Sequence, residues 1–279
     1  MEAYFVNVDP TTLYDVKIVV LLAITVTVAL QFVVSAILQH NGRKEMGEGL
    51  HLARRAQHAA TGLLFYALSY TELGYRYRFQ GVATLGICSL GVYVIHRWRL
   101  SNPAVRDFLA KTYSSILRER ELKGGIPGAF FFLLGVSLAG LIMLTMNDDA
   151  EGLLAWRLSL LYLSLGDPVA AIMGTLFATP GGKGKKSFIG SLYCFLICAA
   201  CTYFEDGSED IVFAIIGGLI GAYAERLDAV ADDNLIIPVV STMALLAWFQ
   251  RHQLLFFSAR PLMDELTNKL IDILAEFAE

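Results

Sequence analysis

The chain is poor in charged residues, which make up 17% of its 279 residues, whereas hydrophobic residues make up 56%. Its mean hydropathy is +0.55. A water-soluble domain of this length needs more charge to cover its surface, so the shortage excludes the soluble globular class. The composition therefore predicts a polytopic membrane protein.

Cysteine is also scarce. The four cysteines are Cys88, Cys194, Cys198 and Cys201, and all of them fall inside apolar segments, which excludes a disulfide framework. The last three share one helical face. Because no histidine or further thiol lies near them, we interpret that face as small-residue helix packing rather than a metal site.

Long apolar runs, by contrast, are abundant. A membrane-spanning helix needs about 20 mainly apolar residues, and about eight segments approach that length. The first follows acidic rather than basic residues and is too long for a secretory signal. We therefore predict an all-α fold with one integral-membrane domain over residues 1–279. The predicted spans cover residues 17–38, 56–73, 81–96, 127–146, 152–166, 188–204, 211–225 and 234–250.

The charge of the loops alternates in sign along the chain, although the net charge is only −4. The loops that follow the first, third and fifth apolar segments are rich in Lys and Arg, and the loops at 147–151 and 205–210 are acidic. The positive-inside rule places the basic loops in the cytosol. We expect Arg54–Arg55, residues 167–187 and residues 225–234 to converge on that face. We also predict an amphipathic surface helix over residues 103–121, and no nucleic-acid partner.

Asp167 ends one apolar segment, directly before Pro168. A carboxylate in a membrane span costs about 3 kcal/mol at the helix centre and usually faces a polar cavity or a partner. One interpretation is that Asp167 only caps a short helix over residues 168–178. The other is that it binds a divalent cation, since Mg²⁺ that bridges phosphates needs only one or two protein carboxylates.

A loop rich in glycine and lysine follows, Gly181-Gly182-Lys183-Gly184-Lys185-Lys186-Ser187. It lacks the spacing of a Walker loop. Its glycines still let backbone N–H groups approach phosphate oxygens, its lysines add positive charge, and Ser187 can open the next helix so that the helix N-terminus faces an anion. An ordinary positive-inside loop would also explain the lysines.

Three ordered motifs resemble those of the CTP-dependent lipid kinases, a family that includes fungal-type diacylglycerol kinase, phytol kinase and dolichol kinase. They are Arg54-Arg55-x-x-His58-x-x-x-Gly62, then Asp167-x-x-Ala170-x-x-x-Gly174 with Lys186-Ser187-x-x-Gly190-Ser191, and finally Glu225 with Asp233-Asn234-x-x-Ile237-Pro238. Three positions depart from the family pattern. Arg55 replaces the usual Lys, Ala178 replaces a recurrent glycine, and Ile189 replaces the Glu of the dolichol branch, which favours the diacylglycerol or phytol branch.

The resemblance implies transfer of the γ-phosphoryl group of CTP to a lipid hydroxyl, with diacylglycerol giving phosphatidate, at the cytosolic face of the endoplasmic reticulum in phospholipid biosynthesis. The implied catalytic residues are Asp167, Asp233, Arg54, Arg55 and Lys186. The implied nucleotide-binding residues are Gly174, Lys183, Lys185, Lys186, Ser187, Gly190 and Asn234. Mg²⁺ or another divalent cation would be held by Asp167, Glu225 and Asp233.

Several roles stay open. Asp233 could equally act as the base for the lipid hydroxyl, and Arg54 and Arg55 could instead bind lipid headgroups or simply follow the positive-inside rule. We interpret His58 as a packing or orienting histidine rather than a proton carrier.

Three other functions are compatible with parts of the sequence. The lipid could be phytol or a polyprenol such as dolichol. A phosphatidate cytidylyltransferase is faintly indicated by Glu225-Arg226-Leu227-Asp228, which is similar to an Asp-Arg-x-Asp element, but the preceding Gly-Gly is missing and that family has no loop like residues 167–191. A small transporter could use Asp167 and Glu225 as coupling carboxylates, but such proteins often have paired halves, and this chain shows no internal repeat.

Overall fold

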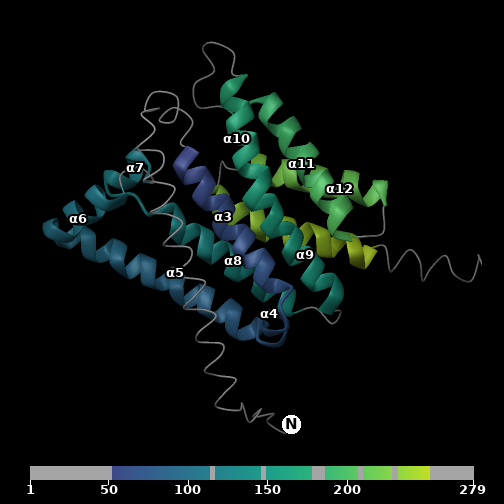
Figure 1. Ribbon diagram of the computed structural model, residues 1–279, viewed down its shortest axis with the longest axis horizontal. Coiled ribbons are helices and arrows are strands. Elements are labelled where there is room, and N and C mark those ends of the chain that lie inside the picture. The colour runs from purple at the N-terminus through teal and green to yellow at the C-terminus, as the bar shows by residue number, and fades with distance from the viewer. Residues whose placement is uncertain are drawn as a thin grey trace, which may run out of the picture.

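The computed structural model describes residues 52–113, 117–145, 149–177, 186–206, 210–227 and 232–251. Within these ranges the chain is helical and contains no strand. The predicted first span at 17–38, together with Lys183, Lys185 and Asp228, lies outside them. The helices, most of them labelled in Figure 1, are α3 (Leu52–Ser69), α4 (Glu72–Arg76), α5 (Arg78–Ser101), α6 (Pro103–Tyr113), α7 (Glu119–Leu122), α8 (Gly128–Leu144), α9 (Asp149–Leu161), η1 (Tyr162–Gly166), α10 (Asp167–Leu176), α11 (Phe188–Asp206), α12 (Ile211–Arg226) and a last helix, Asp233–Arg251.

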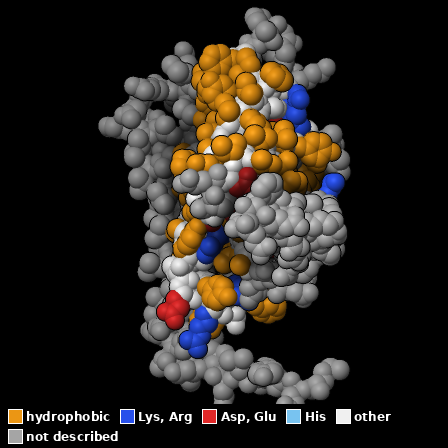
Figure 2. All heavy atoms as spheres, turned by 90° about the vertical axis from the view of Figure 1, so that its right-hand side faces the viewer, with side chains coloured by type: hydrophobic (Ala, Val, Ile, Leu, Met, Phe, Trp, Pro, Cys, Tyr) orange, Lys and Arg blue, Asp and Glu red, His pale blue; other side chains and the backbone are white. Residues whose placement is uncertain are grey.

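Four of these helices are long and apolar enough to cross a membrane: Arg78–Ser101, Ala150–Leu176, Phe188–Asp206 and Asp233–Arg251. Large apolar side chains on α5 point outward, as Ile87 and Leu90 do at 70% and 61% exposure. Figure 2 shows hydrophobic side chains over much of the described surface on one face. Such a surface is suited to lipid, and the chain is an all-α membrane protein, as predicted. The total of about eight spans stays a prediction.

The long helix Ala150–Leu176 is made of α9, a π-helical turn (η1) and α10 in one continuous rod. Asp167 has helical angles, φ −62° and ψ −50°, and its N–H bonds to the carbonyl of Tyr162, five residues earlier. Pro168 has no N–H to donate, so an ordinary α-helix would lose a bond here, and the wider turn absorbs that loss. The interpretation of Asp167 as the cap of a separate helix over 168–178 is therefore wrong.

Helix α3 docks on this π-helical turn. The carbonyl of Leu163 has no main-chain donor, because the Asp167 N–H is already used and Pro168 lacks one. His58 Nε2–H donates to that carbonyl at 2.9 Å. One turn later, a Cβ on Gly62 would lie 1.7 Å from the Ser164 hydroxyl, so only glycine lets the two helices come this close. His58 thus orients α3, as expected.

Small residues pack α11 against α12 and η1. Cys198 is fully buried, and a Cβ on Gly166 or Gly221 would lie 2.8 or 2.4 Å from its sulfur. The hydroxyls of Tyr162 and Thr202 hydrogen-bond at 2.6 Å across the same contact. Membrane helices associate through such close contacts because lipid supplies no hydrophobic drive between them. The predicted packing role of the cysteine face is consistent with this arrangement.

The predicted surface helix over residues 103–121 is wrong in its extent. The structure has α6 and then a separate α7, with residues 114–116 outside the described ranges. The chain is extended at Arg118, with φ −69° and ψ 153°, and the Glu121 carboxylate accepts the Arg118 N–H at 3.2 Å. This capping starts a new helix at Glu119. None of the residues of α6 is buried, which suits a membrane surface.

Candidate active site

Lys186, just before α11, lies between two carboxylates from other helices. Its Nζ is 3.1 Å from Glu225 Oε1 at the end of α12 and 3.0 Å from Asp233 Oδ1 at the start of the last helix, and it also donates to the Glu225 carbonyl. Burial alone would lower the pKa of Lys186, but Asp233 and Glu225 outweigh it and hold that pKa above its ordinary value. Lys186 is therefore a cation at neutral pH.

Helices α10 and α11 meet at two glycines beside this lysine. A Cβ on Gly190 would lie 2.6 Å from the carbonyl oxygen of Ala170, and one on Gly174 would lie 2.9 Å from the Ser187 hydroxyl. The Ser187 hydroxyl accepts the Gly190 N–H at 3.0 Å, so this serine caps α11. The close approach thus places the N-terminus of α11, which attracts anions, against α10.

Asp167 is half-buried where the π-helical turn passes into α10. Its carboxylate interacts electrostatically with Lys186, Arg54, Arg118 and Arg55. In the described part of the chain no side chain hydrogen-bonds to that carboxylate. Glu225 and Asp233 lie close enough to repel it, so Asp167 stands among charges of both signs without a fixed partner in the described ranges.

Arg54 and Arg55 lie at the start of α3. Burial lowers the pKa of Arg54 to about 10, so it is still protonated at neutral pH. One terminal nitrogen of Arg55, Nη1, is buried without a hydrogen-bond partner. A buried N–H donor without an acceptor is costly unless a group such as a phosphate oxygen binds to it.

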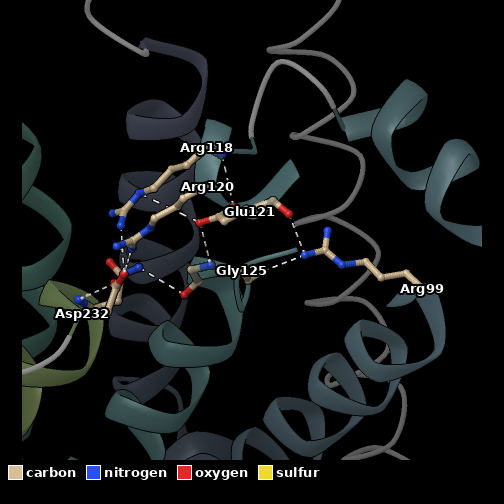
Figure 3. A network of polar contacts seen from close by, with 8 residues as sticks. Arg99, Arg118, Arg120, Glu121, Gly125 and Asp232 are labelled. Carbon is tan, nitrogen blue, oxygen red and sulfur yellow. Dashed lines mark hydrogen bonds and ion pairs between the residues drawn. The ribbon is translucent and has the colours of Figure 1, made fainter. Parts of the chain in front are cut away.

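Asn234 follows Asp233 and faces the start of α8. Its side-chain amide donates to the carbonyl of Gly128 at 3.1 Å, and the Gly128 N–H donates to the Glu121 carboxylate at 3.0 Å. The site is thereby joined to a polar network on the α7 segment, part of which is drawn in Figure 3.

Sequence reasoning missed that network. Asp232, whose side chain is 3% exposed, pairs with Arg118 at 2.9 Å and with Arg120. The positive-inside rule alone explained the basic residues over 97–123. The second carboxylate in the Asp232-Asp233 pair was the sequence signal that a basic residue elsewhere pairs with it.

No group of three His, Cys, Asp or Glu in the described ranges is arranged to hold a metal ion. Glu225 and Asp233 instead share Lys186. Of the predicted set, Asp167 is the carboxylate that forms no hydrogen bond or ion pair with a side chain within the described ranges. Because Mg²⁺ usually arrives with phosphates and needs one or two carboxylates, this donor set fits such a cation at Asp167. The full set of Asp167, Glu225 and Asp233 stays a prediction.

The structure brings the three sequence regions together at one end of the helices. Arg54 and Arg55 begin α3, Lys186 precedes α11, Glu225 lies near the end of α12, and Asp233 begins the last helix. The fold and site define an all-α membrane protein with basic and acidic side chains gathered at one end, among them Arg54, Arg55 and Lys186, which suit an anionic substrate.

Comparison with known proteins gives one similarity of direct relevance. The chain is 29% identical over 211 residues to CTP-dependent diacylglycerol kinase 1 of Schizosaccharomyces pombe (strain 972 / ATCC 24843), covering 70% of this chain and 91% of that protein. This relative confirms the resemblance to the CTP-dependent lipid kinase family that the motifs predicted. No protein-family model matches the chain, and no solved structure matches it.

Proposed function

We propose that this protein transfers the γ-phosphoryl group of CTP to the hydroxyl of diacylglycerol and so forms phosphatidate. The observation that carries the proposal is the cluster around Lys186, a cation held by Glu225 and Asp233 close to Asp167, whose carboxylate accepts no side-chain hydrogen bond in the described ranges. The similarity to a CTP-dependent diacylglycerol kinase supports both the nucleotide and the lipid.

The reaction needs neutralised phosphates and an alcohol aligned with the γ-phosphorus, because phosphoryl transfer is catalysed mainly by positioning and electrostatics. We assign the binding of phosphate oxygens to the start of α11 and to Lys186, which would exchange one of its present acceptors for the nucleotide. The unused donor of Arg55, with Arg54 beside it, is placed to stabilise charge on the transferred group. A divalent cation held by Asp167 would neutralise further phosphate charge when the nucleotide is bound.

A base must accept the proton that the lipid hydroxyl loses. Among the described residues, Asp233 and Glu225 are the carboxylates that contact Lys186, and their side chains are 23% and 8% exposed. The more accessible Asp233 is better placed to meet a substrate. We assign it the role of base, and we assign Glu225 the role of holding Lys186.

We further propose a single domain over residues 1–279 with about eight spans and the site on the cytosolic face of the endoplasmic reticulum. Support comes from the positive-inside rule, which predicts the cytosol for the basic loops of the sequence, and Arg54 and Lys186 belong to or border two of these loops. A cytosolic site would also give CTP direct access.

The test is phosphate transfer by the purified protein in detergent from γ-labelled CTP or ATP, with diacylglycerol, phytol and dolichol offered separately. The expected result is label in diacylglycerol that depends on CTP, a divalent cation and Asp167, with Asp167→Asn inactive but folded. Arg106→Gln is the matched control, since Arg106 is 58% exposed and pairs with Asp107 away from the site.

Other results of this assay would indicate a different lipid substrate or a different function. Label in phytol or dolichol alone would change the lipid and keep the kinase. Release of pyrophosphate from CTP and phosphatidate, with no labelled lipid, would show a cytidylyltransferase instead. Access to Asp167 from both sides of the membrane, without any transfer, would favour a transporter.

A further inference from the structure

Asp232 uses its two carboxylate oxygens for two different tasks. Oδ1 accepts the Asn234 N–H at 3.3 Å, and the Asp232 carbonyl accepts the N–H groups of Leu235 and Ile236 at 2.9 and 3.2 Å, so this residue caps the last helix. Oδ2 binds the guanidinium groups of Arg118 and Arg120. The start of the last helix is thus held by its own cap and by ion pairs to two arginines from another segment.

The segment that carries the two arginines is itself held firmly. Glu121 is 3% exposed, and its oxygens accept the N–H groups of Arg118 at 3.2 Å and Gly128 at 3.0 Å. Arg99 on α5 donates to the carbonyls of Glu121 and Gly125 at 2.8 and 2.6 Å (Figure 3). Because the donors and acceptors are buried and paired, the arginines have a rigid support.

Asp233 and Asn234 directly follow the clamped Asp232. Asp233 binds Lys186 at 3.0 Å, and Asn234 binds the carbonyl of Gly128 at 3.1 Å, at the start of the helix that follows the α7 segment with the two arginines. A change at Asp232 would therefore move both residues relative to Lys186. Arg118 also interacts electrostatically with Asp167, so the test below separates positioning from a direct effect of Arg118 on the site.

We propose that Arg118 and Arg120 are positioning residues, which act through Asp232 to hold Asp233 and Asn234 at the catalytic lysine. This inference rests on the proposed kinase function and deepens it. It predicts that the α7 segment affects turnover, because a displacement of about 1 Å at reacting groups can cost on the order of 100-fold in rate.

The test compares Arg118→Gln and Asp232→Asn with the wild type by kcat and by KM for CTP. Asparagine can keep the helix cap through Oδ1, and its NH2 group replaces the oxygen that binds the arginines, so the cap is retained and the clamp is lost. We expect each variant to lower kcat about tenfold while KM for CTP stays within about twofold, since the site is loosened rather than removed. Arg118→Lys should recover part of kcat and keeps the test valid if Arg118→Gln yields little folded protein. Lys123→Gln is the control, because Lys123 and Glu119 form a pair on the same segment at 73% and 81% exposure.

A double-mutant cycle separates positioning from direct binding of CTP. If Arg118 acts through Asp232, the variant with both substitutions should be no slower than either single variant. If the two effects multiply and KM for CTP rises about tenfold, Arg118 binds phosphate directly and the inference is overturned. Variants indistinguishable from Lys123→Gln would overturn it while leaving the kinase intact. A wild-type protein that labels no lipid would overturn the proposed function, and the inference with it.

Discussion

Replacing Lys186 with glutamine would leave the carboxylates of Glu225 and Asp233 without the cation that lies 3.1 and 3.0 Å from them. Removing one partner from a buried ion pair costs about 3 to 5 kcal/mol, because the remaining charge is desolvated and unpaired. Lys186 and Asp233 keep 21% and 23% of their side-chain surface, so water would relieve part of that cost. We expect a loss of about 2 to 4 kcal/mol in the free energy of unfolding, and loss of phosphate transfer.

A second substitution separates stability from activity. Glu225 is more buried than Asp233, so its carboxylate is the more costly charge to leave without Lys186. Combining Lys186→Gln with Glu225→Gln removes that charge. We expect the double variant to recover about 1 to 2 kcal/mol over Lys186→Gln and to remain inactive. Denaturant unfolding in detergent measures the first quantity, and transfer from γ-labelled CTP measures the second. A single variant as stable as the wild type, or a double variant less stable than the single one, would refute this account of the cluster.

Three further predictions concern helix contacts. Gly190→Ala should destabilise the protein more than Gly174→Ala, by about 1 to 3 kcal/mol in thermal unfolding. The new methyl group at position 190 would meet the fixed carbonyl of Ala170 at 2.6 Å, whereas the one at position 174 would meet the Ser187 hydroxyl, which can rotate. Equal effects of the two substitutions would contradict this. His58→Phe should cost about 1 to 3 kcal/mol by the same assay, because the Leu163 carbonyl loses its donor, and an unchanged midpoint would show that water replaces the histidine. Gly62→Ala should lower both stability and activity by separating α3 from the π-helical turn, which parallel melting and transfer assays would check, and full activity would exclude the tight contact.

The sequence predicted the helical segments well where apolar length decided them. Each predicted segment from 56–73 to 234–250 overlaps a helix, although α3 begins at Leu52 and ends at Ser69. Helix ends were less predictable, because they depend on local bonds. The segment expected to stop before Asp167 continues to Leu176, since the π-helical turn tolerates Pro168.

The sequence indicated which residues belong to the candidate site, but it did not indicate which of them contact one another. Lys186, Glu225 and Asp233 were each selected as functional, but their mutual contact depends on how α11, α12 and the last helix pack, which no local pattern contains. Asp232 was missed for the same reason. Its arginine partners are more than 100 residues away along the chain, |i−j| being 114 for Arg118 and 112 for Arg120.

The π-helical turn changes which side of the long helix faces the core. A π-turn is equivalent to one residue inserted into an α-helix, and each residue advances the helix by about 100°. Everything from Asp167 onward is therefore turned to a new face relative to α9. One uninterrupted rod can then direct its first half toward the core, where Leu158 and Leu160 are fully buried, and its second half toward Lys186 and α11. The membrane helix thus changes its facing direction without a break or a loop.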